Sequence, residues 1–316
     1  MKYSKFLFLI TILLNSPLKA QDYDIQWTKG PNLPIRLSET RAIACNDKVY
    51  VIGGKITHDN SDLNDNENVA FIFEYNPENE TWSRKADMHS KQYDVALAVI
   101  GNKIYAIGSE TEVYDTKTNA WQRLKPLPGG MAHLEAAVVN RKIYVFGCEE
   151  GSYSKTMMYD PKNDKWTEKS PIPTPRLAPN VAVIDEKIYV MGGIGFNENN
   201  QLAKFLQTIE IYNPQNDSWK SKNLMPQSFW GAEGTIVKDD NIFLINIRST
   251  ENQYKYNVYI CNPKTDKWFT GTNLPKSYRE HGVALLKNKI YVIGGHDETF
   301  TQYSDVFIGK FPRKDK

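Results

Sequence analysis

The stretch KNKIYVIGG, from Lys287 to Gly295, recurs along the chain and decides its fold. A polar turn, a β-branched and aromatic run and a glycine pair return at NDKVYVIGG (46–54), GNKIYAIGS (101–109), NRKIYVFGC (140–148), DEKIYVMGG (185–193) and, degraded, DDNIFLINI (239–247). Copies that are spaced by about 40 to 55 residues are typical of a propeller or a solenoid. Each copy predicts a hairpin turn followed by a short strand, and the glycines let the backbone pass close to a neighbour.

A second repeat alternates strictly with the first, so the two are halves of one unit. Its copies are FEYNPENETW (73–82), EVYDTKTNAW (112–121), MMYDPKNDKW (157–166), EIYNPQNDSW (210–219) and YICNPKTDKW (259–268). Each predicts a strand, a turn rich in Asn, Asp and Pro, and a second strand that opens on tryptophan. Four short strands per unit make a blade, which needs its neighbours to cover both faces.

The double glycine, the tyrosine of KIY and the outer tryptophan resemble the kelch repeat, and the resemblance covers nearly all of the chain after residue 26. The sixth unit ends at VFIGKF (306–311) without its outer strand, whereas DIQWTKGPNLP (24–34) supplies a matching strand around Trp27. We therefore expect an all-β, six-bladed propeller of four-stranded blades, closed into a ring by the N-terminal strand.

Residues 1–20, MKYSKFLFLITILLNSPLKA, have the form of a secretory signal peptide, since lysines precede an apolar run too short for a membrane anchor. We expect cleavage near Ala20. Residues 21–316 then form a single propeller domain in the periplasm of a bacterium, or outside the cell. No other stretch is long and apolar enough to span a bilayer, so we expect no membrane span.

Charge and cysteine usage restrict the classes of partner. The formal net charge is +2 at pH 7 and no basic stripe is present, which argues against nucleic acid. Cys45, Cys148 and Cys261 fall in three different blades and are expected to be packed thiols, although one disulfide stays open. We expect a monomer without a metal ion or another cofactor.

The segments that enter the inner strands are where the repeats differ, and function in repeat folds lies in such variable segments. They read LSETRAIA, QYDVALAV, AHLEAAVV, RLAPNVAV, WGAEGTIV and YREHGVAL. All five histidines fall on the same predicted face. The polar and aromatic side chains expected to converge on one mouth at the propeller axis are Glu39, Arg41, Tyr93, Asp94, His133, Glu135, Arg176, Asn180, Trp230, Glu233, Tyr278, Arg279, Glu280 and His281.

The residue types at this mouth indicate an anionic mono- or oligosaccharide. Guanidinium forks bind carboxylates in a bidentate manner, and flat aromatic rings suit sugar faces. The arginines have an alternative role as ion pairs between blades, and the histidines have one as hydrogen-bonded residues of a polar channel. The substrate-binding residues that we predict are Arg41, Arg176, Arg279, Trp230 and Glu280.

The resemblance extends to carbohydrate-active kelch propellers such as the sialate mutarotases, and some polysaccharide lyases are propellers too. It implies, first, β-elimination on uronic-acid oligosaccharides by a carbon–oxygen lyase or dehydratase, which needs a cation, a base and an acid. The alternative enzyme is a sialic acid mutarotase or epimerase, for which Glu233 or Glu135 would act with Arg176. The catalytic residues that we predict are His133, His281, Tyr93, Tyr278 and Glu233.

Two further classes of protein with this kind of fold were compared with the sequence. Galactose oxidase also has kelch repeats, but it needs a copper ion and a tyrosine cross-linked to cysteine, whereas the cysteines here lie on or near packed strands. A propeller that binds a glycan or a protein without catalysis stays open. The connection 55–68 is rich in carboxylates and amides but lacks the EF-hand spacing, so we expect no calcium there.

Overall fold

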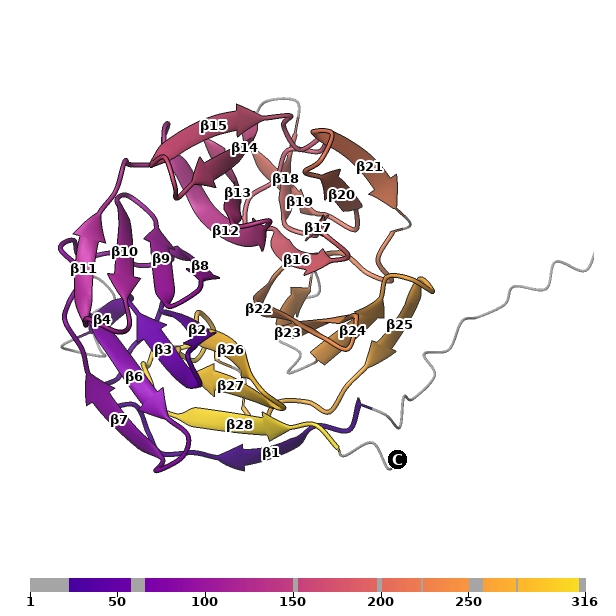
Figure 1. Ribbon diagram of the computed structural model, residues 1–316. Coiled ribbons are helices and arrows are strands. Elements are labelled where there is room, and N and C mark those ends of the chain that lie inside the picture. Colours follow the sequence, from indigo (N-terminus) through magenta and orange to yellow (C-terminus); the bar gives the residue numbers. More distant parts are fainter. Residues whose placement is uncertain are drawn as a thin grey trace, which may run out of the picture.

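The computed structural model describes residues 23–312 with the exception of 58–65, 150–152, 198–200, 223, 250–257 and 277. Within these residues, six four-stranded antiparallel sheets stand around one axis as a closed ring (Figure 1), and two short hairpins project from it. The all-β, six-bladed propeller predicted from the repeats is confirmed. Residues 1–20 lie outside the described residues, so the signal peptide stays a prediction.

The strands of each blade run from the axis outward in an order that follows the chain. The first three blades are β2 (Arg41–Cys45), β3 (Lys48–Ile52), β6 (Ile72–Asn76) and β7 (Thr81–Arg84); β8 (Ala96–Ile100), β9 (Lys103–Ile107), β10 (Thr111–Asp115) and β11 (Ala120–Arg123); and β12 (Met131–Val139), β13 (Lys142–Glu149), β14 (Tyr153–Asp160) and β15 (Lys165–Lys169).

The fourth and fifth blades follow the same order, and only the sixth takes a strand from the other end of the chain. They are β16 (Asn180–Ile184), β17 (Lys187–Met191), β20 (Ile209–Asn213) and β21 (Ser218–Lys222); β22 (Phe229–Lys238), β23 (Asn241–Ser249), β24 (Val258–Asn262) and β25 (Lys267–Thr270); and β26 (Gly282–Leu286), β27 (Lys289–Ile293), β28 (Val306–Lys310) and β1 (Gln26–Lys29). The two projecting hairpins are β4 (Lys55–Thr57) with β5 (Asn66–Asn68) and β18 (Ile194–Phe196) with β19 (Leu202–Phe205).

The repeated tyrosine and tryptophan join the blades to one another. The Tyr159 and Trp166 rings lie 4.9 Å apart within the third blade, and the Trp166 indole donates a hydrogen bond to the Lys125 carbonyl of the segment before that blade. Trp82, Trp121 and Trp219 make equivalent indole hydrogen bonds. Each aromatic pair contributes about 0.5–1.5 kcal/mol beyond its burial, so the motif that identifies the repeat also holds the ring.

The N-terminal strand closes the ring as expected. Strand β1 pairs with β28 in antiparallel register from Gln26 opposite Lys310 to Lys29 opposite Phe307 (Figure 1). The indole of Trp27 approaches the Thr272 carbonyl at 3.4 Å, which is the contact the other outer tryptophans make. The two ends of the described chain therefore share the sixth blade.

The glycine pairs carry the backbone past the inner-strand entries. Gly295 has a φ of +94°, and a Cβ atom there would lie 2.6 Å from the Arg279 carbonyl oxygen. Its own N–H donates to the Leu37 carbonyl oxygen at 2.7 Å. No other residue type fits so close an approach, and the approach fixes the entry segments around the axis.

The described residues contain no helix that is long and apolar enough to cross a membrane. Cys45, Cys148 and Cys261 are buried and form no disulfide among the described residues, so the expected packed thiols are confirmed. Burial raises the pKa of Cys261 to about 12.

Candidate functional site

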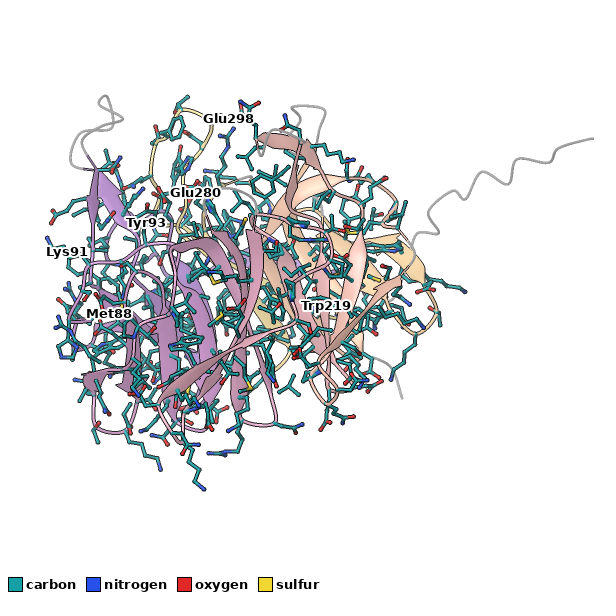
Figure 2. All side chains as sticks on the ribbon, turned by 90° about the horizontal axis from the view of Figure 1, so that it is seen from above. Met88, Lys91, Tyr93, Trp219, Glu280 and Glu298 are labelled. Atoms are coloured by element: carbon teal, nitrogen blue, oxygen red, sulfur yellow. The ribbon has the colours of Figure 1, made fainter. Side chains whose placement is uncertain are left out.

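The inner strands of five blades are entered through the same strained backbone conformation. Glu39, Asp94, His133, Ala178 and Glu280 each precede the lysine of their KIY motif by nine residues, and their φ angles lie between 47° and 54°. Non-glycine residues adopt this left-handed region rarely, and such residues cluster at functional sites. Tyr93 and Glu280, from two different blades, lie toward the same end of the propeller (Figure 2), which we call the mouth.

An ionic network joins three blades at the mouth. The Arg41 guanidinium at the start of β2 forms an ion pair with Oδ1 of Asp94, and Oδ2 of Asp94 lies 3.0 Å from Nδ1 of His133. Burial acts to raise the pKa of Asp94, but Arg41 and His133 outweigh it and hold this pKa below its ordinary value. The hydrogen bond to Asp94 raises the pKa of His133, whose side chain is half exposed.

Glu135 lies beside this network and lines the central cavity. Its Oε1 is 3.9 Å from the Arg41 guanidinium, and the cavity between the inner strands has a volume of about 340 Å³. The side chain keeps 34% of its surface exposed to the cavity, and the partial desolvation of its carboxyl group outweighs the opposing charge of Arg41 and raises the pKa of Glu135 to about 7, with Asp94 adding to the rise. Glu135 can therefore both donate and accept a proton near neutral pH.

A second ion pair lies on the rim of the mouth. Nζ of Lys55 is 2.7 Å from Oε1 of Glu39 and 3.8 Å from the ring centre of Tyr93. Burial, followed by the charge of Glu280, raises the pKa of Glu39. Tyr93 is 43% exposed, so part of its ring is accessible from solvent.

The sixth blade contributes an imidazole that is held on both sides. Nε2 of His296 lies 3.0 Å from Oε2 of Glu280, and Nδ1 lies 2.7 Å from the Asp297 carbonyl oxygen. Both nitrogens therefore lie beside acceptors, which fixes the orientation of the ring. The Arg279 main chain exchanges two hydrogen bonds with that of His296, which fixes this segment beside the mouth.

Arg176 does not lie at the mouth, and the structure offers no support for its predicted role in substrate binding or catalysis. Its side chain is fully buried in the fourth blade, where the guanidinium pairs with Glu210 and donates to the Gly192 carbonyl oxygen and to Thr208. These partners occupy both terminal nitrogens. The alternative structural role of this arginine is the one that the geometry supports.

Tyr278 and His281 are also withdrawn from the mouth. Tyr278 is 3% exposed, donates its hydroxyl hydrogen bond to Asp305 at 2.5 Å and stacks on Tyr303. His281 is fully buried, and burial together with Arg41 lowers its pKa to about 3. A tyrosine that already donates and an imidazole held neutral out of reach of solvent are poor candidates for the catalytic acid and base that we predicted.

The position of an entry residue, counted back from the KIY lysine, distinguishes these buried residues from those at the mouth. Arg176 and Tyr278 lie eleven residues before the KIY lysine, as do the buried Leu37 and Gln92. His281 lies eight residues before it, as do the buried Thr40, Val95 and Leu134. Asp94, His133 and Glu280 instead lie nine residues before the lysine, Arg41 and Glu135 lie seven, and Tyr93 lies ten. Comparing the repeats column by column would have marked the columns of Arg176 and His281 as buried, although it does not explain Asn180, which is buried in the same column as Arg41 and Glu135.

The other predicted residues have mixed placements. Asn180 is buried and donates a hydrogen bond to Thr235 of the next blade, and His89 binds the buried Glu112. The side chains of Trp230 and Glu233, on β22, lie outside the described residues, as does His58. Lys55 is a mouth residue that the sequence analysis did not select. In the described part of the chain, no cluster of His, Cys, Asp and Glu could hold a metal ion.

The fold and the repeats define a kelch-type β-propeller, and sequence comparison agrees. The chain matches the family described as the KLHDC2/KLHL20/DRC7 Kelch-repeats domain over residues 39–246 and 94–295. The protein therefore belongs to the kelch-repeat family.

Curated relatives and a solved structure share this fold. Kelch-like protein 36 of Rattus norvegicus is 22% identical over 292 residues, which are 88% of this chain and 39% of that protein. Kelch-like protein 15 of Danio rerio is 25% identical over 302 residues, or 91% of this chain and 43% of that protein. This chain thus spans about two fifths of their length. The solved "Structure of YjhT" superposes with a TM-score of 0.70 at 14% identity and covers 88% of this chain and 96% of that chain.

Proposed function

We propose that the protein binds a sugar acid at the mouth of the propeller and interconverts its anomers, as a mutarotase does. The observation that carries this proposal is Glu135, a carboxyl group with a pKa of about 7 that lines the cavity 3.9 Å from Arg41. A partly desolvated carboxyl group tuned to neutral pH beside a fixed cation is a recurrent feature of acid–base sites.

Anomer exchange needs only proton transfers between oxygen atoms. A base removes the proton of the anomeric hydroxyl while an acid protonates the ring oxygen, so the ring opens, and closure on the other face of the carbonyl gives the second anomer. Glu135 can take either role at neutral pH. His133, whose pKa is raised by Asp94, supplies a second group that donates and accepts protons.

The substrate class follows from charge and size. Arg41, Lys55 and His133 bring cationic groups to the mouth, and such groups attract a carboxylate. The exposed ring of Tyr93 suits the apolar face of a sugar. The cavity of about 340 Å³ lies at the lower end of the range for small-molecule sites, which favours a monosaccharide over a polymer.

β-Elimination on uronates has less support because the residues predicted to perform it are occupied elsewhere. Arg176 is paired inside the fourth blade, the Tyr278 hydroxyl is bound to Asp305, and His281 is buried. Elimination is kept as an outcome of the experiment below. We also infer from residues 1–20 that the chain is exported before it meets its substrate.

The test is to mix the purified protein with sialic acid or with galacturonic acid and follow anomer exchange by two-dimensional exchange NMR. Glu135→Gln should slow the catalysed exchange by about 10²- to 10⁴-fold, since it removes the proton donor and acceptor. His133→Gln should slow it by about tenfold or more. The matched control is His89→Gln, because His89 also binds a carboxylate, Glu112, but takes no part in the network of Arg41, Asp94 and His133.

Each other outcome selects a different function. A rise in the ultraviolet absorbance of unsaturated uronates would replace mutarotation with elimination. Ligand-induced shifts in Tm without any exchange would favour the non-catalytic binding propeller. That second candidate has its own support, since Tyr93 and Phe300 are exposed aromatic side chains, 43% and 45% respectively, in segments of the mouth face.

A further inference from the structure

The lysine of the KIY motif lies opposite a side-chain oxygen in the same way in the first four blades. It lies opposite an Asp or Asn of the third strand, on the face of the propeller opposite the mouth. The pairs are Lys48 with Asn76 (2.7 Å), Lys103 opposite Asp115 in register, Lys142 with Asp160 (2.6 Å) and Lys187 with Asn213 (2.8 Å). A side-chain oxygen beside this ammonium group is therefore part of the repeat.

The sixth blade breaks this pattern with a second cation. Its third strand comes from VFIGKF instead of a Tyr-Asn-Pro segment, and Lys289 lies directly opposite Lys310. In the described part of the chain, neither ammonium group makes an ion pair or a hydrogen bond. Like charges directly opposite in a sheet are about 4.5–5.5 Å apart at Cβ and destabilise it. The sixth blade therefore lacks the side-chain oxygen that the first four blades place beside this lysine.

A cavity of about 260 Å³ opens at these two lysines. It lies between the sixth and first blades, and its lining includes Leu286, Tyr291 and Pro77 beside both lysines. Tyr291 is 1% exposed and forms part of the aromatic and apolar wall. The cavity thus combines this wall with two ammonium groups that have no ion pair among the described residues.

Lys287 and the carboxylate of Glu78 also line the cavity, and each has a partner of opposite charge. Nζ of Lys287 lies 3.2 Å from Asp47, and the Asn288 amide donates to the Phe311 carbonyl oxygen. Glu78 is exposed and lies 4.0 Å from Lys48. These contacts leave Lys289 and Lys310 as the cations available to a ligand.

We propose that Lys289 and Lys310 bind a phosphate or sulfate group in this cavity, as a second site independent of the mouth. The ligand's oxygen atoms take the place that the Asp160 carboxylate fills in the third blade. Lysine ammonium groups bind such oxyanions as point charges, and a tetrahedral anion can accept hydrogen bonds from two of them at once. Binding also removes the repulsion between the two strands.

Thermal unfolding of the full protein in chloride and in inorganic phosphate, at equal ionic strength, tests this site. Phosphate at about ten times Kd should raise Tm by about 2–4 °C. Lys310→Asp introduces the Lys–Asp pair that the second and third blades have, so it should raise Tm in chloride and abolish the phosphate increment. Titration calorimetry with phosphate, sulfate and a sugar phosphate then distinguishes a free ion from an ester.

The controls separate the site from general salt effects, because phosphate stabilises most proteins weakly by exclusion from their surface. Lys310→Gln should lose the increment without forming a new ion pair. Lys117→Gln changes an exposed lysine of the second blade that does not line the cavity, and it should keep the increment. The proposal is overturned by a wild-type protein without an increment, or by a Lys310→Asp variant that keeps it.

Discussion

His281 is a buried group that opposes folding at its present site. It is fully buried, and neither ring nitrogen has a hydrogen-bond partner within the described residues. The equivalent positions of the second and third blades hold Val95 and Leu134. An unsatisfied buried polar group costs about 1–3 kcal/mol, so His281→Leu should raise the free energy of unfolding by an amount of this order, as measured by urea denaturation at pH 7.

The same substitution should remove a component of acid lability. The pKa of His281 is about 3 in the folded protein, against about 6.5 in an unfolded chain. As pH falls from 6.5 toward 3, the unfolded chain binds a proton that the folded chain does not, so stability is lost by up to about 1.4 kcal/mol per pH unit. The wild type should therefore lose more stability than His281→Leu between pH 7 and pH 5. Parallel losses would show that His281 is protonated in the folded state.

Replacing Arg176 should lower the free energy of unfolding, whereas replacing His281 should raise it. Arg176→Ala leaves the Glu210 carboxylate buried without its cation, and breaking a buried pair in this way costs about 3–5 kcal/mol. Chemical denaturation should show this loss, whereas anomer exchange by the protein that stays folded should be unchanged. The double variant Arg176→Met, Glu210→Leu removes both charges and should recover most of the stability. A folded Arg176→Ala protein that binds no sugar would show that Arg176 does take part in sugar binding.

At the scale of the strand, local chemistry made most of the fold predictable. Turn residues and β-branched runs identified the hairpins, and counting them identified the closing strand around Trp27. The mouth was predictable as a place, because each inner strand begins there. The structure brings together Arg41, Asp94 and His133, as expected for residues at the entries to neighbouring inner strands.

What each entry residue does was less predictable, because residue type does not report orientation. In a strand, neighbouring positions point to opposite faces, so a shift by one residue moves a side chain from the mouth into a blade interface. His133 and His281 differ by one such position relative to the KIY lysine, and one is half exposed while the other is buried. The pKa of Glu135 depends on surroundings contributed by several blades, which a single segment does not contain.

For the whole molecule, the shared fold and the individual mouth are separate properties. The solved structure with a TM-score of 0.70 is only 14% identical to this chain, so the fold persists through wide changes of sequence. Arg41, Asp94 and Glu135 lie in segments that vary even among the blades of this chain. Function can therefore change at the entries without loss of the fold.

The pairing of β1 with β28 closes the ring of six blades. A substitution at Gly309, on β28, should disturb this pairing. A Cβ atom at Gly309 would lie 2.7 Å from Cγ2 of Ile25 and from Cζ3 of Trp27, so Gly309→Ala forces β1 away from β28. Overpacking of this kind costs about 1–3 kcal/mol. Because β1 is the outer strand of the last blade, the loss should lower the Tm of the whole protein and expose Trp27, as read by its fluorescence. Gly130→Ala is the control, since no atom lies within 4 Å of the added methyl group. Equal effects of the two substitutions would mean that packing of the N-terminal strand on β28 does not stabilise the closed ring.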